Sequence, residues 1–261
     1  MSKPDRRAKI LVIQFRLNRN SKVQEQAAIE RGVGIYCDLD YIDALDKSLP
    51  WFSPENILKN YDGVILGGSA EFYFDGERHE SDPEREETRN LLNRLTPLFD
   101  LIFARDIPTF GICFGHQLLG AYVGVEVKND KRQAKVCSHT VSLLSKDKED
   151  KLLAGLPESF AAHYGHKDVL CVVPNEAELL LDGGERCRVP ALRYKNNIYT
   201  TQFHPELNFE DMVDRIENSA GYLPEGTRAE EVFVDDKTSN LMLQNFGKLV
   251  ALQKQESIQE K

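Results

Sequence analysis

The chain of 261 residues carries 42 acidic and 33 basic side chains, which gives a formal net charge of −9 at pH 7. This acidic balance argues against a nucleic-acid groove or an anionic membrane surface as a partner. No apolar run approaches the roughly 20 residues of a membrane-spanning helix. Hydrophobic residues make up 41% and charged residues 29%, a composition typical of a soluble globular protein.

The number and spacing of the cysteines indicate a reducing compartment. Five are present, and no two of them have a C-x-x-C spacing. An odd number without such spacing argues against a disulfide framework and against a zinc site. The charged residues 1–9 lead into a strand without the apolar region of a signal peptide. We therefore expect free thiols, no metal and a cytoplasmic location.

Strands and helices alternate through the first hundred residues. Residues 9–15 contain a continuous apolar run, which suits a parallel strand covered on both faces. A helix over 21–31, with Ser21 as its N-cap and Gly32 as its C-cap, follows this strand. Further strands are expected at 33–39 and 63–66, and a helix from residue 83 to about 104 should bend or break at Pro97. The alternation predicts a doubly wound α/β fold: a mostly parallel central sheet with helices on both faces.

Residues 71–88 mix aromatic side chains with a dense acidic run. Two interpretations of this segment stay open. As a functional element, it is a lid or a partner-docking loop beside a pocket. As a structural element, it is a solvated loop whose acidic side chains favour the N-terminus of the following helix.

Residues 107–120 read as a short buried strand, a tight turn and a helix, with Cys113 at the turn. Gly111 and Gly115 allow a sharp turn with close backbone approach. This arrangement is similar to the G-x-S-x-G nucleophile elbow, with cysteine in place of serine. The free N–H groups and the dipole at the helix N-terminus favour a thiolate, which is the nucleophilic form. The alternative is a buried core thiol without a chemical role.

A base for this nucleophile is available near residue 204. A β-rich run from residue 199 ends in His204-Pro205-Glu206, and in an extended chain His204 and Glu206 share a face. The carboxylate can hold the imidazole in one tautomer, as the third member of a catalytic triad does. A histidine at a strand end beside a solvated carboxylate is the structural alternative.

Three motifs together carry a family resemblance. Residues 111–117 (Gly-Ile-Cys-Phe-Gly-His-Gln), residues 203–206 (Phe-His-Pro-Glu) and a strand that ends in Gly67-Gly68 resemble the class I, or triad, glutamine amidotransferases. The resemblance runs from about residue 9 to residue 211. It points to glutaminase units of the GMP synthase type and their stand-alone relatives. It implies a flavodoxin-like sheet and no cofactor.

The resemblance also assigns roles to residues. Cys113, His204 and Glu206 match the triad, and Gln117 matches a contact to the substrate amino acid. The amides of Gly68 and Phe114 would form the oxyanion hole, because both lie at carboxyl ends of strands, where ligands bind in open α/β sheets. A plain tight turn is the alternative for the Gly67-Gly68 pair.

Two further segments bear on the comparison with the family. The family's Glu-x-Gly signature before the strand at residue 141 is replaced here by Lys131 to Val136, so the substrate contacts of that segment are in doubt. His166 and Asp168 match the family's His-x-Asp loop, which faces the acceptor domain in synthetases, although a surface turn before a strand accounts for them equally well.

We expect one amidotransferase-like domain over residues 1–261, with a core at about 9–220 and a C-terminal loop and helix at 221–261. The helix, from residue 238 to about 255, should pack on the core. Three functions are compatible with the sequence. The chain is a glutaminase that hydrolyses glutamine to glutamate and ammonia for a synthetase partner, a free-standing hydrolase of other γ-glutamyl amides or peptides, or a non-catalytic regulator of the same fold. The intact Cys113, His204 and Glu206 argue against the third.

Overall fold

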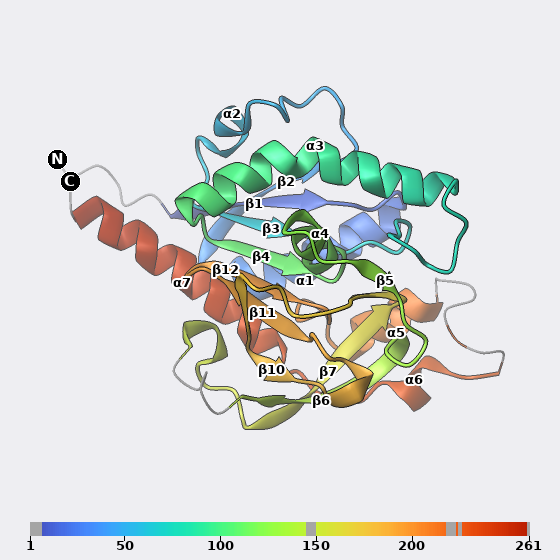
Figure 1. The fold of residues 1–261 in the computed structure, drawn as a ribbon. Helices are drawn as coiled ribbons and strands as arrows, with labels where there is room; N and C mark the ends of the chain where they lie inside the picture. The colour runs from blue at the N-terminus through green and yellow to red at the C-terminus, as the bar shows by residue number, and fades with distance from the viewer. Residues whose placement is uncertain (1–6, 145–149, 218–222, 224–225, 260–261) are drawn as a thin grey trace.

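Figure 1 presents the computed structural model, which describes residues 7–144, 150–217, 223 and 226–259. Seven strands form the central sheet in the order β2-β1-β3-β4-β12-β11-β9. The first five are mutually parallel, and β11 runs antiparallel to both of its neighbours. The strands span Cys37–Asp43 (β2), Ala8–Gln14 (β1), Gly63–Leu66 (β3), Thr109–Ile112 (β4), Ile198–Thr201 (β12), Ala191–Tyr194 (β11) and Ala177–Leu179 (β9).

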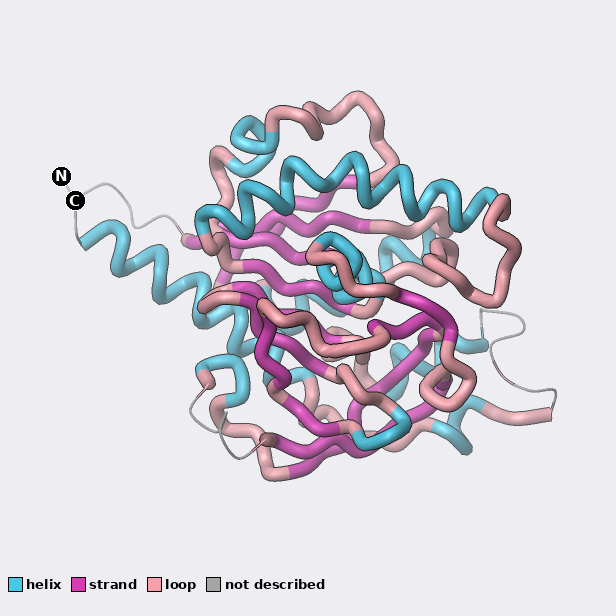
Figure 2. Tube along the Cα trace, in the orientation of Figure 1, coloured by secondary structure: helices cyan, strands magenta, loops and turns pink. Residues whose placement is uncertain are grey.

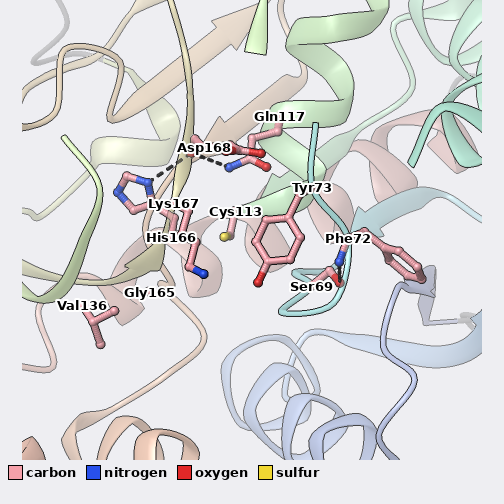
Figure 3. A pocket seen from close by; sticks show the side chains of 10 residues that line it. All are labelled: Ser69, Phe72, Tyr73, Cys113, Gln117, Val136, Gly165, His166, Lys167 and Asp168. Carbon is pink, nitrogen blue, oxygen red and sulfur yellow. Dashed lines mark hydrogen bonds between the residues drawn. The ribbon is translucent and has the colours of Figure 1, made fainter. Parts of the chain in front are cut away.

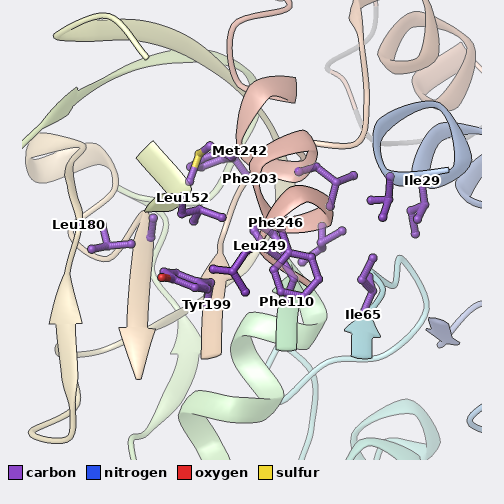
Figure 4. Packing of buried hydrophobic residues seen from close by; sticks show 14 of the residues in the cluster. Ile29, Ile65, Phe110, Leu152, Leu180, Tyr199, Phe203, Met242, Phe246 and Leu249 are labelled. Carbon is purple, nitrogen blue, oxygen red and sulfur yellow. The ribbon is translucent and has the colours of Figure 1, made fainter. Parts of the chain in front are cut away.

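Helices cover both faces of this sheet (Figure 2). Because successive residues of β1 point to opposite faces, Ile10 and Val12 join one buried cluster and Leu11 and Ile13 join the other. Helices α1 and α7 pack on the first cluster, part of which is drawn in Figure 4, and α3 and α4 pack on the second. The helices span Arg19–Val33 (α1), Pro54–Leu58 (α2), Pro83–Arg105 (α3), Phe114–Tyr122 (α4), Phe209–Glu217 (α5), Ala229–Val232 (α6) and Asn240–Gln259 (α7).

Two small antiparallel sheets lie beside the central one. Strands β10 (Leu181–Asp182), β6 (Lys135–Leu143) and β7 (Ser159–His166) form the first, and β5 (Val127–Asn129) pairs with β8 (Asp168–Leu170) in the second. A short 3₁₀ turn, Lys151–Leu153 (η2), lies between β6 and β7, and another, Gly184–Arg186 (η3), lies between β10 and β11 of the central sheet. The register of β6 and β7 sets Lys135 opposite His166, so the end of β7 brings His166 toward the carboxyl edge of the parallel strands.

The predicted fold class is confirmed, but several boundaries differ from the prediction. Helix α1 begins after Asn18, whose side chain accepts the N–H groups of Asn20 and Ser21, so Asn18 and not Ser21 is the N-cap. The helix continues through Gly32 to Val33, which delays the second strand from residue 33 to residue 37. Helix α3 runs without interruption through Pro97 because its leucine and phenylalanine side chains are buried along both halves.

The C-terminal helix packs as predicted. Met242, Leu243, Phe246, Leu249 and Val250 are buried in the cluster that α7 shares with α1 and the central sheet. The segment before it, predicted as a loop, contains the short helix α6. Within the part of the chain that the structure describes, every helix is too short or too polar to span a bilayer.

Candidate active site

Cys113 lies on the tight turn between β4 and α4. Its backbone angles, φ 50° and ψ −93°, are unfavourable for a residue other than glycine and are stabilised by the surrounding hydrogen bonds. The Cys113 N–H donates to the carbonyl of Thr201 at 2.7 Å, and the Gly115 N–H donates to the carbonyl of Gly67 at 3.2 Å. A Cβ at Gly115 would lie 2.5 Å from the carbonyl oxygen of Leu66. The turn therefore joins the carboxyl ends of β3, β4 and β12.

His204 and Glu206 are buried beside this cysteine. The Nδ1 atom of His204 lies 2.7 Å from Oε1 of Glu206, and the imidazole also forms a hydrogen bond with the Cys113 sulfur. Burial alone lowers the pKa of His204, but the charges of Glu206 and Cys113 overcome this effect and raise the pKa to about 9. The three side chains thus form a connected row in which the imidazole retains its proton at neutral pH.

A buried arginine extends this row. The Nη1 atom of Arg215, from α5, lies 3.8 Å from Oε1 of Glu206, and its Nε donates to Oε1 of Gln24 at 3.0 Å. Burial opposes ionisation, but the positive charges of His204 and Arg215 lower the pKa of Glu206. Burial, together with repulsion from Arg16, lowers the pKa of Arg215 to about 10. Glu206 is therefore ionised at neutral pH, with a cation on either side.

Two glutamine side chains connect the cysteine to the far side of the site. Gln202 Nε2 lies 3.7 Å from the Cys113 sulfur, and Gln117 Nε2 donates to the carbonyl oxygen of Asp168 at 2.7 Å and to Oε1 of Gln202 at 3.3 Å. Gln202 was not among the predicted site residues. The sequence did carry a signal for it, because Gln202 and His204 are two apart in an extended segment and share a face.

The two predicted oxyanion-hole amides differ in their surroundings. Phe114 is the first residue of α4, where the N–H has no intrahelical partner. The Gly68 N–H, in contrast, donates to Oε1 of Glu25 at 3.1 Å. Glu25 is a buried residue of α1 that also accepts from Arg16. A role of Gly68 in the oxyanion hole remains a prediction, and it requires this amide to turn toward Cys113.

A cavity of about 50 Å³ opens next to Cys113 (Figure 3). Tyr73 and Lys167 line it from opposite sides, and the Lys167 ammonium lies 5.5 Å from the centre of the Tyr73 ring. His166 also lines the cavity, and burial, followed by the nearby charge of Lys135, lowers the pKa of His166 to about 3. Its imidazole is therefore neutral over the physiological pH range.

The segment after Gly68 covers this cavity. The carboxylate of Asp168 accepts the N–H groups of Asp75 at 2.9 Å and of Gly76 at 2.7 Å, and Phe72 is buried against Phe114. The later part of the segment leads into α3. There Asp82 is the N-cap, and its side chain accepts the Glu84 N–H. The first residues of 71–88 thus lie at the cavity and the last ones begin a helix. A lid or docking role of this segment stays a prediction.

The segment that departs from the family signature also reaches the cavity. Val136 lines it. Lys135 is buried, donates to the carbonyl of Arg186, and lies with its ammonium 4.5 Å from the centre of the Tyr164 ring. A buried lysine therefore lies opposite His166 on the neighbouring strand, in the segment where the family carries its Glu-x-Gly signature.

Comparison with known proteins identifies the family. Residues 26–218 match the family model of the class-I glutamine amidotransferases, and the chain belongs to this family of glutamine-hydrolysing enzymes. Among its relatives are two proteins named as subunits of glutamine-hydrolysing GMP synthases. The one from Methanocaldococcus jannaschii is 31% identical over 66% of this chain and 81% of its own. The one from Methanosphaera stadtmanae is 32% identical over 57% and 67%.

Solved structures agree with the fold. A protein from Thermoplasma acidophilum, described as one of the subunits of a GMP synthase, has a TM-score of 0.65 at 20% identity and covers 98% of both chains. A glutamine amidotransferase from Thermotoga maritima has the same TM-score and identity and covers 94% of this chain and 98% of its own. At this level of identity the likeness defines the architecture of the sheet and its helices.

Proposed function

We propose that the chain is a glutaminase that hydrolyses the side-chain amide of glutamine and supplies the ammonia to a synthetase partner. The observation that carries this proposal is the row formed by Cys113, His204 and Glu206. A strained cysteine at a helix N-terminus, an imidazole hydrogen-bonded to its sulfur and a carboxylate 2.7 Å from the imidazole are the parts that nucleophilic amide hydrolysis requires.

The reaction proceeds in two halves. His204 takes the proton of the Cys113 thiol, the sulfur attacks the amide carbon, an S–C bond forms, and the π electrons move to the carbonyl oxygen. His204 then protonates the amide nitrogen, the C–N bond breaks, and ammonia leaves a γ-glutamyl thioester. In the second half, water attacks the thioester carbon and gives a proton to His204, and the S–C bond breaks to release glutamate. Glu206 orients the imidazole and stabilises its charged form throughout.

Glutamate release from L-glutamine by the purified chain tests this function. We expect the wild type to release glutamate and Cys113→Ala to lose at least about a thousandfold in kcat/KM, because the covalent route is removed. Cys171→Ala is a matched control, since this thiol belongs to a partly exposed residue near Glu126 and does not line the cavity. Equal release by the wild type and Cys113→Ala would refute the assignment of the nucleophile.

The partner is the second part of the proposal. The relatives named as GMP synthase subunits support a synthetase partner that consumes ammonia. The five free cysteines support the reducing cytoplasm as the place where such a pair would work. Affinity purification of the tagged chain from its native cells should recover an ATP-using synthetase, and glutamate release should rise when that protein is added back.

One observation favours a second candidate, a free-standing γ-glutamyl hydrolase. Asp168 matches the loop that faces the acceptor in synthetases, and here its carboxylate is occupied by the amides of Asp75 and Gly76. A chain that covers this loop by itself has less surface free for a synthetase. Turnover of γ-glutamyl dipeptides at a higher kcat/KM than glutamine would favour this candidate, and the reverse order would favour the glutaminase.

A further inference from the structure

The connection between β7 and β8 brings a lysine side chain to the cavity beside Cys113. It consists of Lys167, since β7 ends at His166 and β8 begins at Asp168. Exposed lysines are ordinary, but this one lines the same cavity as the nucleophile, and in Figure 3 its side chain points into that cavity. Its ammonium lies 5.5 Å from the centre of the Tyr73 ring. The cavity therefore contains a cation as well as a nucleophile.

The charge of this lysine is not neutralised by an ion pair. Lys128, on β5, lies 3.2 Å from a carboxylate oxygen of Glu126, and Lys131, in the turn that follows, lies 2.6 Å from one of Glu77. Within the described ranges, no carboxylate lies at ion-pair distance from the Lys167 ammonium. The lysine at the cavity thus differs from those on the neighbouring strand and turn.

The adjacent acidic residue is engaged elsewhere. Asp168 also lines the cavity, but its carboxylate accepts the N–H groups of Asp75 at 2.9 Å and of Gly76 at 2.7 Å. It therefore holds the covering segment, and the Lys167 ammonium remains available to an anionic group of a ligand.

The backbone around Lys167 is held in place. Its carbonyl accepts from Nδ2 of Asn129 at 3.1 Å, and the carbonyl of Asp168 accepts from Nε2 of Gln117 at 2.7 Å. Gln117 belongs to α4, the helix that begins directly after Cys113. The base of the lysine side chain is thus tied to the element that carries the nucleophile, while its flexible four-carbon stem lets the ammonium adjust to a ligand.

Glutamine carries a carboxylate at a suitable distance from its amide. Four C–C bonds of about 1.5 Å each separate the amide carbon from the α-carboxylate carbon, so the two lie at most about 6 Å apart. This is the scale of a small cavity that Cys113 and Lys167 both line. The γ-glutamyl group of other amides and peptides has the same spacing, so the donors of both candidate functions present the same carboxylate.

We propose that Lys167 is a specificity-determining residue, whose ammonium binds the α-carboxylate of the donor while Cys113 attacks the side-chain amide. This proposal rests on the proposed function and deepens it. The site then selects ω-amides that carry a free carboxylate four C–C bonds from the amide carbon. Because the ion pair is the same in the bound donor and in the transition state, it lowers KM and leaves kcat nearly unchanged.

Steady-state ammonia release tests this selection with two donors, L-glutamine and L-glutamine α-amide, in which the carboxylate is replaced by a neutral group. We expect Lys167→Met to raise the KM for glutamine by about tenfold or more, with kcat within about threefold of the wild type. The charge-preserving Lys167→Arg should lose clearly less. For the α-amide, the wild type and Lys167→Met should have KM values within about threefold of each other.

Lys128→Met is the matched control for these variants. It removes a lysine that pairs with Glu126 and does not line the cavity, so its KM for glutamine should stay at the wild-type value.

A second test does not depend on hydrolysis. The reagent 6-diazo-5-oxo-L-norleucine has the carboxylate of glutamine and a diazoketone in place of the amide. Protonation of its diazo carbon and loss of N2 allow a thiol to form a thioether with that carbon. Iodoacetamide, which has no carboxylate, measures the reactivity of the Cys113 thiol itself. We expect the ratio of the two alkylation rates, measured by mass spectrometry, to fall by about tenfold or more in Lys167→Met.

The outcomes separate the two proposals. If the wild type releases no ammonia from glutamine and the ratio of alkylation rates still falls in Lys167→Met, the result counts against the glutaminase function and supports Lys167. An equal ratio in both proteins, no labelling of the wild type by the diazoketone, or an equal rise in KM for glutamine and its α-amide in Lys167→Met would overturn the role of Lys167. In the last case the lysine would only shape the cavity.

Discussion

At the scale of single residues, the addition of one methyl group at Gly68 should lower kcat strongly. An added Cβ would lie 3.0 Å from Arg16 Nη2 and 3.1 Å from His204 Cε1, which is closer than ordinary van der Waals contact. Gly68→Ala should therefore displace the His204 imidazole from Cys113 and lower kcat by about 100-fold. Steady-state kinetics measure this loss, and an unchanged circular dichroism spectrum excludes unfolding. A variant with more than a third of the wild-type kcat would contradict the assignment.

Glu206 should couple the stability of the protein to pH through His204. The pKa of His204 in the folded protein, about 9, lies above the ordinary value of 6.5. The stability that the protonated imidazole adds to the folded state is therefore fully present below about pH 6.5 and is lost as the pH rises through 9. Glu206→Gln removes the main cause of this raised pKa. The variant should therefore be less stable than the wild type by a margin that is largest near pH 6.

Urea unfolding of both proteins at pH 6, 7.5 and 9 measures this margin. Its pH-dependent part is at most about 3 kcal/mol for a shift of this size. A difference in unfolding free energy that stays constant over the three pH values would show that Glu206 does not raise the pKa of His204.

The sequence predicted Cys113, His204 and Glu206 because each stands in a local motif whose geometry follows from a few neighbouring residues. It did not predict Arg16, Glu25 or Arg215. Arg16 and Glu25 are nine apart on a strand end and a helix, and Arg215 approaches Glu206 from α5. Such buried charges have no local pattern, because charged residues on helices are normally solvated, and only the folded structure brings them together.

At the scale of elements, the covering segment depends on one carboxylate. Asp168 accepts two backbone amides, from Asp75 and Gly76, and charge-assisted bonds of this kind contribute about 1.5–3 kcal/mol each. Asp168→Ala should therefore open the segment locally and speed tryptic cleavage after Arg78 by about tenfold or more. Limited digestion with mass spectrometry measures the rate.

Asp130→Ala is the matched control, because Asp130 accepts bonds within its own turn, from Arg132 and Gln133. If Asp168→Ala is cleaved after Arg78 at the wild-type rate, other contacts hold the segment in place, such as the packing of Phe72 on Phe114.

The sequence predicted the elements correctly where apolar residues recur with a clear period. It misplaced their ends where two residues can both serve as a cap, as Asn18 and Ser21 can at the start of α1. The strand at 63–66 was located correctly, and the cysteine turn followed from its glycines. The second strand was placed four residues early because helix α1 continues past Gly32 to Val33. A glycine inside a helix costs about 1 kcal/mol relative to alanine, which the burial of α1 against the core outweighs.

At the scale of the whole molecule, we expect the chain to unfold as one cooperative unit, which is the prediction of a single domain. Helix α7 supports this view because it joins regions that are far apart in sequence. Phe246 contacts the ring of Phe110 from the central sheet, with ring centres 5.4 Å apart. Asn245 donates to the carbonyls of Leu152 and Ala154 beside the smaller sheet. A helix that packs on both regions should couple their unfolding.

Phe246→Ala tests this coupling. Removing a fully buried ring should lower the unfolding free energy by about 3–5 kcal/mol, and in a single cooperative unit the whole denaturation curve should shift to lower urea. Far-ultraviolet circular dichroism follows the helices on both faces of the central sheet, and the fluorescence of Trp51 follows only the face that α3 and α4 cover, opposite to α7. Coincident curves from both probes, in the wild type and the variant, would support one domain. A variant in which the fluorescence transition stays in place while the circular dichroism transition moves would divide the chain into separately unfolding parts, and α7 would then stabilise only the face that it covers.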